Sequence, residues 1–128
     1  MLELIIVMVI MGVVITFAVP AFRTTQERAL DNEARANLRL IVAAEKIYRM
    51  ETSNYYASAA SDDEASINGN LKLLLATDAS RKWGYNTVAD NAIVPQTCCA
   101  QAARRNGPDA RTWRMRNTEA DLVSGACP

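Results

Sequence analysis

Residues 1–22 read MLELIIVMVIMGVVITFAVPAF, and 18 of these 22 residues are apolar. Between Leu4 and Val19 no side chain carries a charge. About 20 apolar residues are enough for a helix to span the hydrocarbon core of a bilayer. The stretch is longer than the apolar region of a usual secretory signal, and it lacks a basic start and a small-residue cleavage site. It therefore predicts a membrane-spanning helix.

Three residues interrupt this apolar stretch. Glu3 places a carboxylate near one end, where an ionisable group usually marks a function, since burying it at a helix centre costs about 2.5–3.5 kcal/mol. Gly12 and Pro20 enclose a segment rich in β-branched residues, which lose rotamer freedom in a helix. Proline also removes one backbone hydrogen bond. We expect the helix to melt between Gly12 and Pro20 when these helices pack together in an assembly.

From Arg23 the composition changes, and the rest of the chain carries 14 basic and 13 acidic residues. Helical periodicity nevertheless continues through residues 23–53, which predicts an amphipathic helix. Its predicted apolar stripe, broken by Glu45, contains Leu30, Ala34, Leu38, Ile41, Ala44 and Tyr48, widened by Leu40 and Ile47. Together the two stretches predict one helix over residues 1–52. At 1.5 Å per residue that helix is about 75 Å long, longer than a domain of this size is wide.

Residues 54–128 are predicted to form a globular region that begins with a loop over residues 54–70. The acidic triplet Asp62-Asp63-Glu64 offers oxygen ligands for calcium, but its spacing matches no calcium-binding loop, so a solvated acidic turn is the favoured interpretation. Residues 71–75 form a short apolar run whose pattern fits a helix or a strand.

Three segments with strand patterns follow, at residues 83–89, 92–102 and 112–117. Pro95 restricts part of the second segment to an edge or a bulge. Trp113 and Met115 alternate with Arg114 and Arg116 in the third segment. We predict an α+β fold in which a small antiparallel sheet, at about residues 83–117, packs its aromatic face on the apolar stripe of the helix. Large aromatic side chains at alternating positions are more often core than a carbohydrate platform, so Trp83 is expected in the core with Trp113.

The charge pattern and the residue types disfavour several functions. The balanced charge gives no basic excess for a phosphate backbone, so nucleic-acid binding is not indicated, and the local arginine clusters (Arg104, Arg105, Arg111, Arg114, Arg116) are read as solvated faces. The chain has no histidine and no phosphate-binding glycine motif. A membrane-anchored enzyme or receptor would depend on carboxylates such as Asp62, Asp63 or Glu119, which nothing organises. We therefore expect no catalytic residues, no metal and no cofactor.

The three cysteines suit one disulfide and one spare thiol. Cys127 lies next to the C-terminus, and a bridge back to a strand would hold the C-terminal region, about residues 98–127, in place. Because neighbours on a strand face opposite ways, Cys98 and Cys99 cannot both face Cys127. A strained Cys98–Cys99 bridge is the alternative.

Glu3 at the start of the apolar stretch, Gly12 in its middle and Pro20-Ala21-Phe22 at its end resemble the N-terminus of type IV pilins and pseudopilins. The mature start of that family is usually Phe-Thr-Leu-x-Glu-Leu, whereas this chain has Met1-Leu2-Glu3-Leu4, without the first two family residues. The resemblance covers residues 1–22 closely and the rest only in layout. It implies the ladle-shaped pilin fold, with the helix as the handle.

The resemblance also implies a function. Pilins are stored in the cytoplasmic membrane and assemble with copies of themselves into an extracellular filament, so the membrane, a prepilin peptidase and a pilus assembly platform are the implied partners. Glu3 would pair with the N-terminal amine of a neighbouring subunit in the filament core. Cys99-Ala100-Gln101-Ala102 resembles a Cys-Ala-x-Ala strand of some pilins, which favours Cys99 over Cys98 as the partner of Cys127. A pseudopilin of type II secretion is the second interpretation, although those proteins commonly bind calcium and lack a disulfide.

Overall fold

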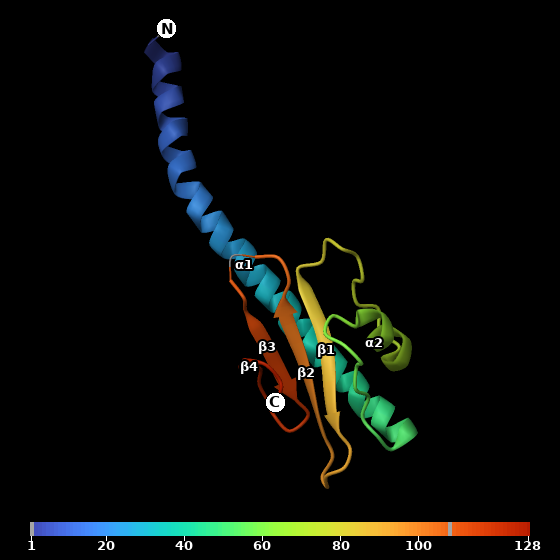
Figure 1. Ribbon diagram of the computed structural model, residues 1–128. Helices are drawn as coiled ribbons and strands as arrows, with labels where there is room; N and C mark the ends of the chain where they lie inside the picture. Colours follow the sequence, from blue (N-terminus) through green and yellow to red (C-terminus); the bar gives the residue numbers. More distant parts are fainter. Residues whose placement is uncertain (1, 108) are drawn as a thin grey trace. The chain divides into compact units, whose positions relative to one another are not determined.

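The computed structural model describes residues 2–107 and 109–128, without the side chains of Ala18 and Pro20 (Figure 1). The chain divides into two compact units, residues 1–32 and residues 33–128, and we call the second unit the head. Its helices and strands are α1 (Leu2–Thr52), α2 (Glu64–Leu71), β1 (Trp83–Asp90), β2 (Thr97–Arg104), β3 (Thr112–Arg116) and β4 (Val123–Ser124). The strands form one antiparallel sheet in the order β1-β2-β3-β4, so the α+β prediction is confirmed.

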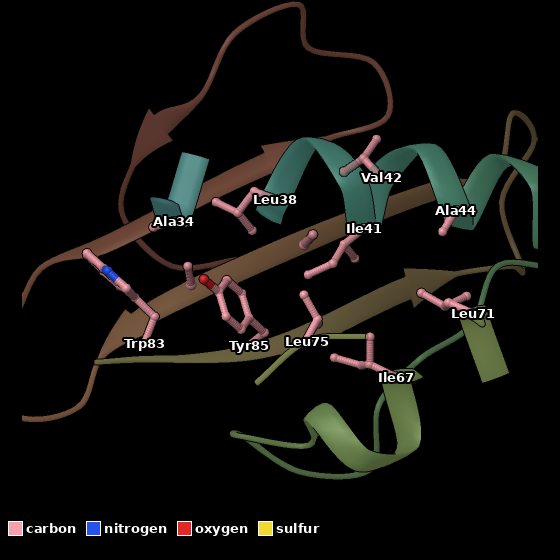
Figure 2. Close-up of a cluster of buried hydrophobic side chains, with 12 residues drawn as sticks. Ala34, Leu38, Ile41, Val42, Ala44, Ile67, Leu71, Leu75, Trp83 and Tyr85 are labelled. Carbon is pink, nitrogen blue, oxygen red and sulfur yellow. The ribbon is translucent and has the colours of Figure 1, made fainter. Parts of the chain in front are cut away.

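The core of the head lies between the second half of α1 and one face of the sheet (Figure 2). Leu38 and Ile41 of α1 are fully buried, and Trp83 and Tyr85 of β1 are 1% and 3% exposed. The prediction that Trp83 belongs to the core rather than to a carbohydrate platform is therefore confirmed. Trp113 and Met115 are partly buried against the same core, as their alternation with arginines predicted.

The buried arc of α1 differs in part from the predicted stripe. Ala34, Leu38, Ile41 and Ala44 are buried as expected, and Val42 joins them. Leu40 and Ile47 were predicted to widen the stripe, but they remain 48% and 55% exposed. At 3.6 residues per turn these two side chains are rotated by roughly 120–140° from Ala34, beyond the arc that the sheet covers.

The predicted loop over residues 54–70 is wrong in its last third, because α2 begins at Glu64 and ends at Leu71. Ile67 and Leu71 point from α2 into the core, which stabilises a helix too short to form alone. The run 71–75, left open between helix and strand, is helical at Leu71 and otherwise belongs to the connection between α2 and β1. Leu71 ends the helix, Lys72 adopts a left-handed conformation that stops it, and Leu75 returns to the core.

The strands occupy nearly the predicted segments, with one shift and one omission. β2 runs from Thr97 to Arg104 rather than over 92–102, so Pro95 lies in the β1–β2 connection, where its missing N–H breaks no ladder. β4 has only two residues and pairs with Trp113 and Arg114. A strand of two residues is too short to show an alternating pattern, so β4 was not predicted.

Candidate functional site: an exposed apolar segment and a disulfide-braced head

The first part of α1, which we call the apolar segment (residues 2–22), exposes its side chains on all sides. Fifteen large apolar side chains in it are between 49% and 76% exposed. In the part of the chain that the structure describes, α1 is the one helix long and apolar enough to cross a membrane, with a mean hydropathy of 2.8 in an 18-residue window of which no residue is buried. The segment is therefore a surface that needs an apolar environment.

Glu3 lies in the first turn of α1. A carboxylate there interacts favourably with the free N–H groups and the positive end of the helix dipole. Among residues 2–107 and 109–128, no hydrogen bond or ion pair joins the Glu3 side chain to another residue. The carboxylate is thus available to a partner outside the single chain.

The stretch from Gly12 to Pro20 is helical in the single chain. The Thr16 hydroxyl donates a hydrogen bond to the Gly12 carbonyl oxygen at 2.8 Å, a contact that often bends helices slightly. A Cβ added at Gly12 would touch nothing within this chain, so the glycine leaves room for an outside neighbour. The predicted melting concerns helices packed in an assembly, and it stays a prediction.

A disulfide joins Cys99 of β2 to Cys127, with a Cα–Cα distance of 6.0 Å. This is the pair that the pilin resemblance favoured. Cys98 remains a free, buried thiol. The two neighbours differ because Cys98 lies on the core face of β2 with Ala100 and Ala102, whereas Cys99 lies on the opposite face, under the C-terminal tail.

Hydrogen bonds also hold the C-terminal tail on that outer face. The Cys127 amide donates to Gln101 Oε1 at 2.8 Å, and Arg114 Nη1 donates to the Ala126 carbonyl at 3.1 Å. The Gly125 amide donates to the Thr112 carbonyl at 2.9 Å. The disulfide closes a loop with a sequence separation of 28 residues. In the chain-entropy model this closure stabilises the head by about 3.5 kcal/mol.

Glu45 is a buried carboxylate whose only sequence signal was its place in the apolar stripe of α1. The residue is 1% exposed, and its Oε2 accepts a hydrogen bond from the Tyr56 amide at 2.9 Å. Burial raises the pKa of Glu45 to about 7, against the opposing effects of the Tyr56 amide and the Thr87 hydroxyl. Burial and the nearby Glu45 charge raise the pKa of the Cys98 thiol to about 12. Cys98 therefore stays protonated and unreactive at neutral pH.

The acidic triplet is a solvated turn only in part: Asp62 is exposed in a turn as predicted, but Glu64 begins α2 and is buried, contrary to the prediction. Glu64 is 2% exposed, and its Oε2 accepts a hydrogen bond from Arg81 Nη2 at 2.8 Å while its Oε1 accepts one from the Tyr85 amide at 2.7 Å. Asp63 Oδ2 accepts a hydrogen bond from the Ala59 amide, and Asp62 pairs with Arg105 Nε at 3.3 Å. Glu64 and Asp62 thus fasten the start of α2 and the turn before it to residues of the sheet region, whereas Asp63 braces the connection itself.

The predicted arginine clusters are only partly solvated. The Arg104 guanidinium lies 5.4 Å from the centre of the Trp83 ring, and that of Arg35 lies 4.5 Å from the centre of Trp113. Arg111 Nη2 pairs with Asp109 Oδ2 at 2.9 Å. Arg104 of the predicted clusters and Arg35 of α1 thus lay their flat guanidinium groups over aromatic rings, which sequence patterns did not indicate.

Comparisons with known proteins found no relative of this chain. No protein-family model matches the chain, and neither a curated protein nor a solved structure matches it.

Proposed function

We propose that this protein is a type IV pilin, a subunit that is stored in a membrane through its apolar segment and then assembles into an extracellular filament. The observation that carries the proposal is the contrast within α1. Its second half is one face of a folded, disulfide-braced head, whereas its first half is apolar on every side, and its large apolar side chains are exposed in the part of the chain that the structure describes.

The free energy of exposing the apolar segment to water supports this function. Burying one large apolar side chain is worth about 1.5–3 kcal/mol, so fifteen of them amount to roughly 20–45 kcal/mol. A lipid bilayer covers such a surface before assembly. A bundle of the same segments from neighbouring subunits covers it in a filament, where heterologous contacts that do not close produce a helical polymer.

Glu3 supplies a reason for these segments to pack in one register. A carboxylate moved into an apolar bundle without a partner costs several kcal/mol. The N-terminal amine of a neighbouring subunit would neutralise Glu3 and remove this cost at one axial offset only. The Glu3 carboxylate has no partner in the described part of its own chain, as this pairing requires.

The edges of the sheet argue against a filament built by strand exchange. On the outer edge of β1, the Ser58 and Asp63 amides donate hydrogen bonds to the Thr87 and Tyr85 carbonyls at 3.0 and 3.1 Å. On the opposite side, β4 pairs with β3. The β1 edge is already covered and the β4 edge has only two residues, so neither offers a long free strand to another chain, which favours helix packing as the mode of assembly.

In this proposal a prepilin peptidase and a pilus assembly platform in the cytoplasmic membrane are the partners, and the cell surface is the destination. A type II secretion pseudopilin is the second candidate, because the same N-terminal pattern occurs in both. The Cys99–Cys127 disulfide favours a pilin, since pseudopilins commonly lack such a bridge. Electron microscopy of cells distinguishes long surface filaments from short periplasmic ones.

The substitution Glu3→Ala tests the proposal. We expect the variant to fractionate with membranes as the wild type does, while filaments on the cell surface fall sharply. Glu33→Ala is the matched control, because Glu33 is an exposed carboxylate on the same helix outside the apolar segment. Normal filament yield from Glu3→Ala would contradict the proposal.

A further inference from the structure

Asparagine is followed by glycine twice in the head, at Asn68-Gly69 and at Asn106-Gly107. In this dipeptide the backbone nitrogen of the glycine can attack the side-chain carbonyl carbon of the asparagine, because glycine has no Cβ to hinder the approach. The attack needs an asparagine side chain that can turn toward the backbone, a glycine amide that is not hydrogen-bonded, and access to water. The two dipeptides differ in all three respects.

The first dipeptide is held in place by α2 and the residues after it. Asn68 Nδ2 donates a hydrogen bond to the Leu75 carbonyl at 2.9 Å, and Asn68 Oδ1 accepts one from the Leu75 amide at 2.7 Å. Leu75 belongs to the core of the head, and Asn68 is itself half-buried. Gly69 lies beyond the first four residues of α2, so its amide takes part in the hydrogen bonding of the helix. Neither group can move into the position that the attack requires.

The second dipeptide lies in the connection between β2, which ends at Arg104, and β3, which begins at Thr112. Asn106 and Gly107 are both exposed. Among residues 2–107 and 109–128, no hydrogen bond joins the Asn106 side chain or the Gly107 amide to a partner. The side chain can therefore turn toward the backbone, and the amide has no hydrogen bond to break before it reacts.

We propose that Asn106 is a site of spontaneous deamidation and that the fold protects Asn68 from the same reaction. The Gly107 amide gives its proton to water, and its nitrogen forms a bond to Asn106 Cγ. The bond from Cγ to the side-chain nitrogen breaks, and ammonia leaves. Water then opens the resulting succinimide ring at either carbonyl, which yields aspartate or isoaspartate. The net reaction consumes water and releases ammonia, with no change of oxidation state.

The products would change the β2–β3 connection in two ways. Aspartate places a carboxylate where the neutral amide was. Isoaspartate also carries the backbone through the former side chain, which lengthens the connection by a methylene group. Both changes accumulate with the age of the chain and leave the core of the head unchanged. The same conversion at Asn68 would instead remove the donor of the hydrogen bond to the Leu75 carbonyl.

Incubation of the full chain in detergent at mildly alkaline pH tests the proposal. Peptide mapping by mass spectrometry follows the conversion of each asparagine, and enzymatic methylation of isoaspartate identifies that product. We expect Asn106 to convert at least about tenfold faster than Asn68, because only Asn106 can reach the geometry of attack. The matched control is the same chain unfolded in guanidinium chloride with a reductant. There the two dipeptides should convert at similar rates, because the protection of Asn68 depends on the fold.

Gly107→Ala tests the route through the ring. A Cβ at this position would have as its nearest neighbours atoms of the Arg104 side chain, whose flexible end can shift, so we expect the variant to fold. Thermal unfolding in detergent checks this. The added methyl group should slow the conversion of Asn106 about tenfold or more and leave that of Asn68 unchanged.

Two results would overturn the proposal. In the folded wild type, conversion of Asn106 that is no faster than that of Asn68 would show that the fold does not distinguish the two dipeptides. Conversion of Asn106 in Gly107→Ala at the wild-type rate would show that the amide is lost without attack by the backbone. The wild-type comparison needs no variant and no filament, so it stands whether or not the chain assembles.

Discussion

The two halves of α1 have similar backbones and opposite surroundings. In the head, Leu38 and Ile41 are fully buried under the sheet, whereas in the apolar segment Ile6 and Ile10 are 50% and 57% exposed. The head half carries apolar side chains on one arc and charges on the other. The apolar segment carries apolar side chains on all sides of the helix. A one-sided helix can be completed by its own chain, but an all-round one can be completed only by lipid or by other chains.

This contrast separates stability from assembly. Side chains of the head contribute to the free energy of unfolding of one subunit. In the proposed function, side chains of the apolar segment serve membrane storage and filament packing, and we expect them to leave the folding of the head unchanged. Each prediction below therefore compares a substitution in the head with a matched control substitution that should have little effect on the unfolding of the head. Unfolding is followed by near-ultraviolet circular dichroism in detergent.

The largest effect is expected from Glu64→Ala. The substitution leaves the Arg81 guanidinium and the Tyr85 amide without their buried partner, which should lower the free energy of unfolding by about 4 kcal/mol. Glu119→Ala, which removes a half-buried carboxylate from the turn after β3, should cost far less. A loss under about 1 kcal/mol for Glu64→Ala would mean that the Glu64 carboxylate is solvated rather than buried with its partners.

The second largest loss in the free energy of unfolding is expected from breaking the disulfide. Cys127→Ser should destabilise the head by about 3.5 kcal/mol, because the unfolded chain regains the entropy of an open loop. Cys98→Ala is the control, because it removes the free thiol and keeps the bridge. Peptide mapping without reduction should recover a fragment that joins Cys99 to Cys127. Equal stability of Cys127→Ser and the wild type would show that the tail is held by its hydrogen bonds alone.

The contrast between the halves of α1 is tested directly by truncating one isoleucine in each. Ile41→Ala creates a cavity in the core and should cost about 3 kcal/mol. Ile10→Ala should leave the unfolding of the head within about 0.5 kcal/mol of the wild type, because Ile10 is 57% exposed and is not a member of the buried core cluster. A comparable loss from both variants would contradict the separation of the two halves.

The smallest effect concerns Glu45 and depends on pH. Its pKa is raised from 4.5 to about 7 in the folded head, so the folded state binds this proton more tightly than the unfolded state does. Through this group, stability is greatest below about pH 4.5 and falls as the pH rises to about 7. Glu45→Gln should therefore stabilise the head by about 2 kcal/mol at pH 8 and by much less at pH 5. Glu51→Gln, at an exposed position, should show no such dependence.

Much of the fold was predictable because it follows from local patterns. The apolar run over residues 1–22 and the three-and-four spacing of Ala34, Leu38 and Ile41 indicated one long helix, which α1 confirms. Alternation in residues 112–117 indicated β3 and its core face. The errors fall where local pattern is weak. α2 has eight residues in a polar segment, β4 has two, and Leu40 and Ile47 are apolar although no element covers them.

The candidate site was predicted unevenly for the same reason. Glu3, Gly12 and Pro20 can be identified from the sequence alone, because what distinguishes them is the apolar residues next to them in the chain. The burial of Glu64 depends on Arg81 and Tyr85, which lie 17 and 21 residues away in sequence.

The sequence by itself determined that the first part of this chain is a helix that requires an apolar environment. Transfer free energy and helical geometry are properties of neighbouring residues, and no distant contact can reverse an all-round apolar surface. Only the tertiary structure decided that Cys99 rather than Cys98 meets Cys127, and that Glu45 and Glu64 are buried. Those outcomes depend on which face of a strand or helix another element covers, and packing between distant segments sets that choice.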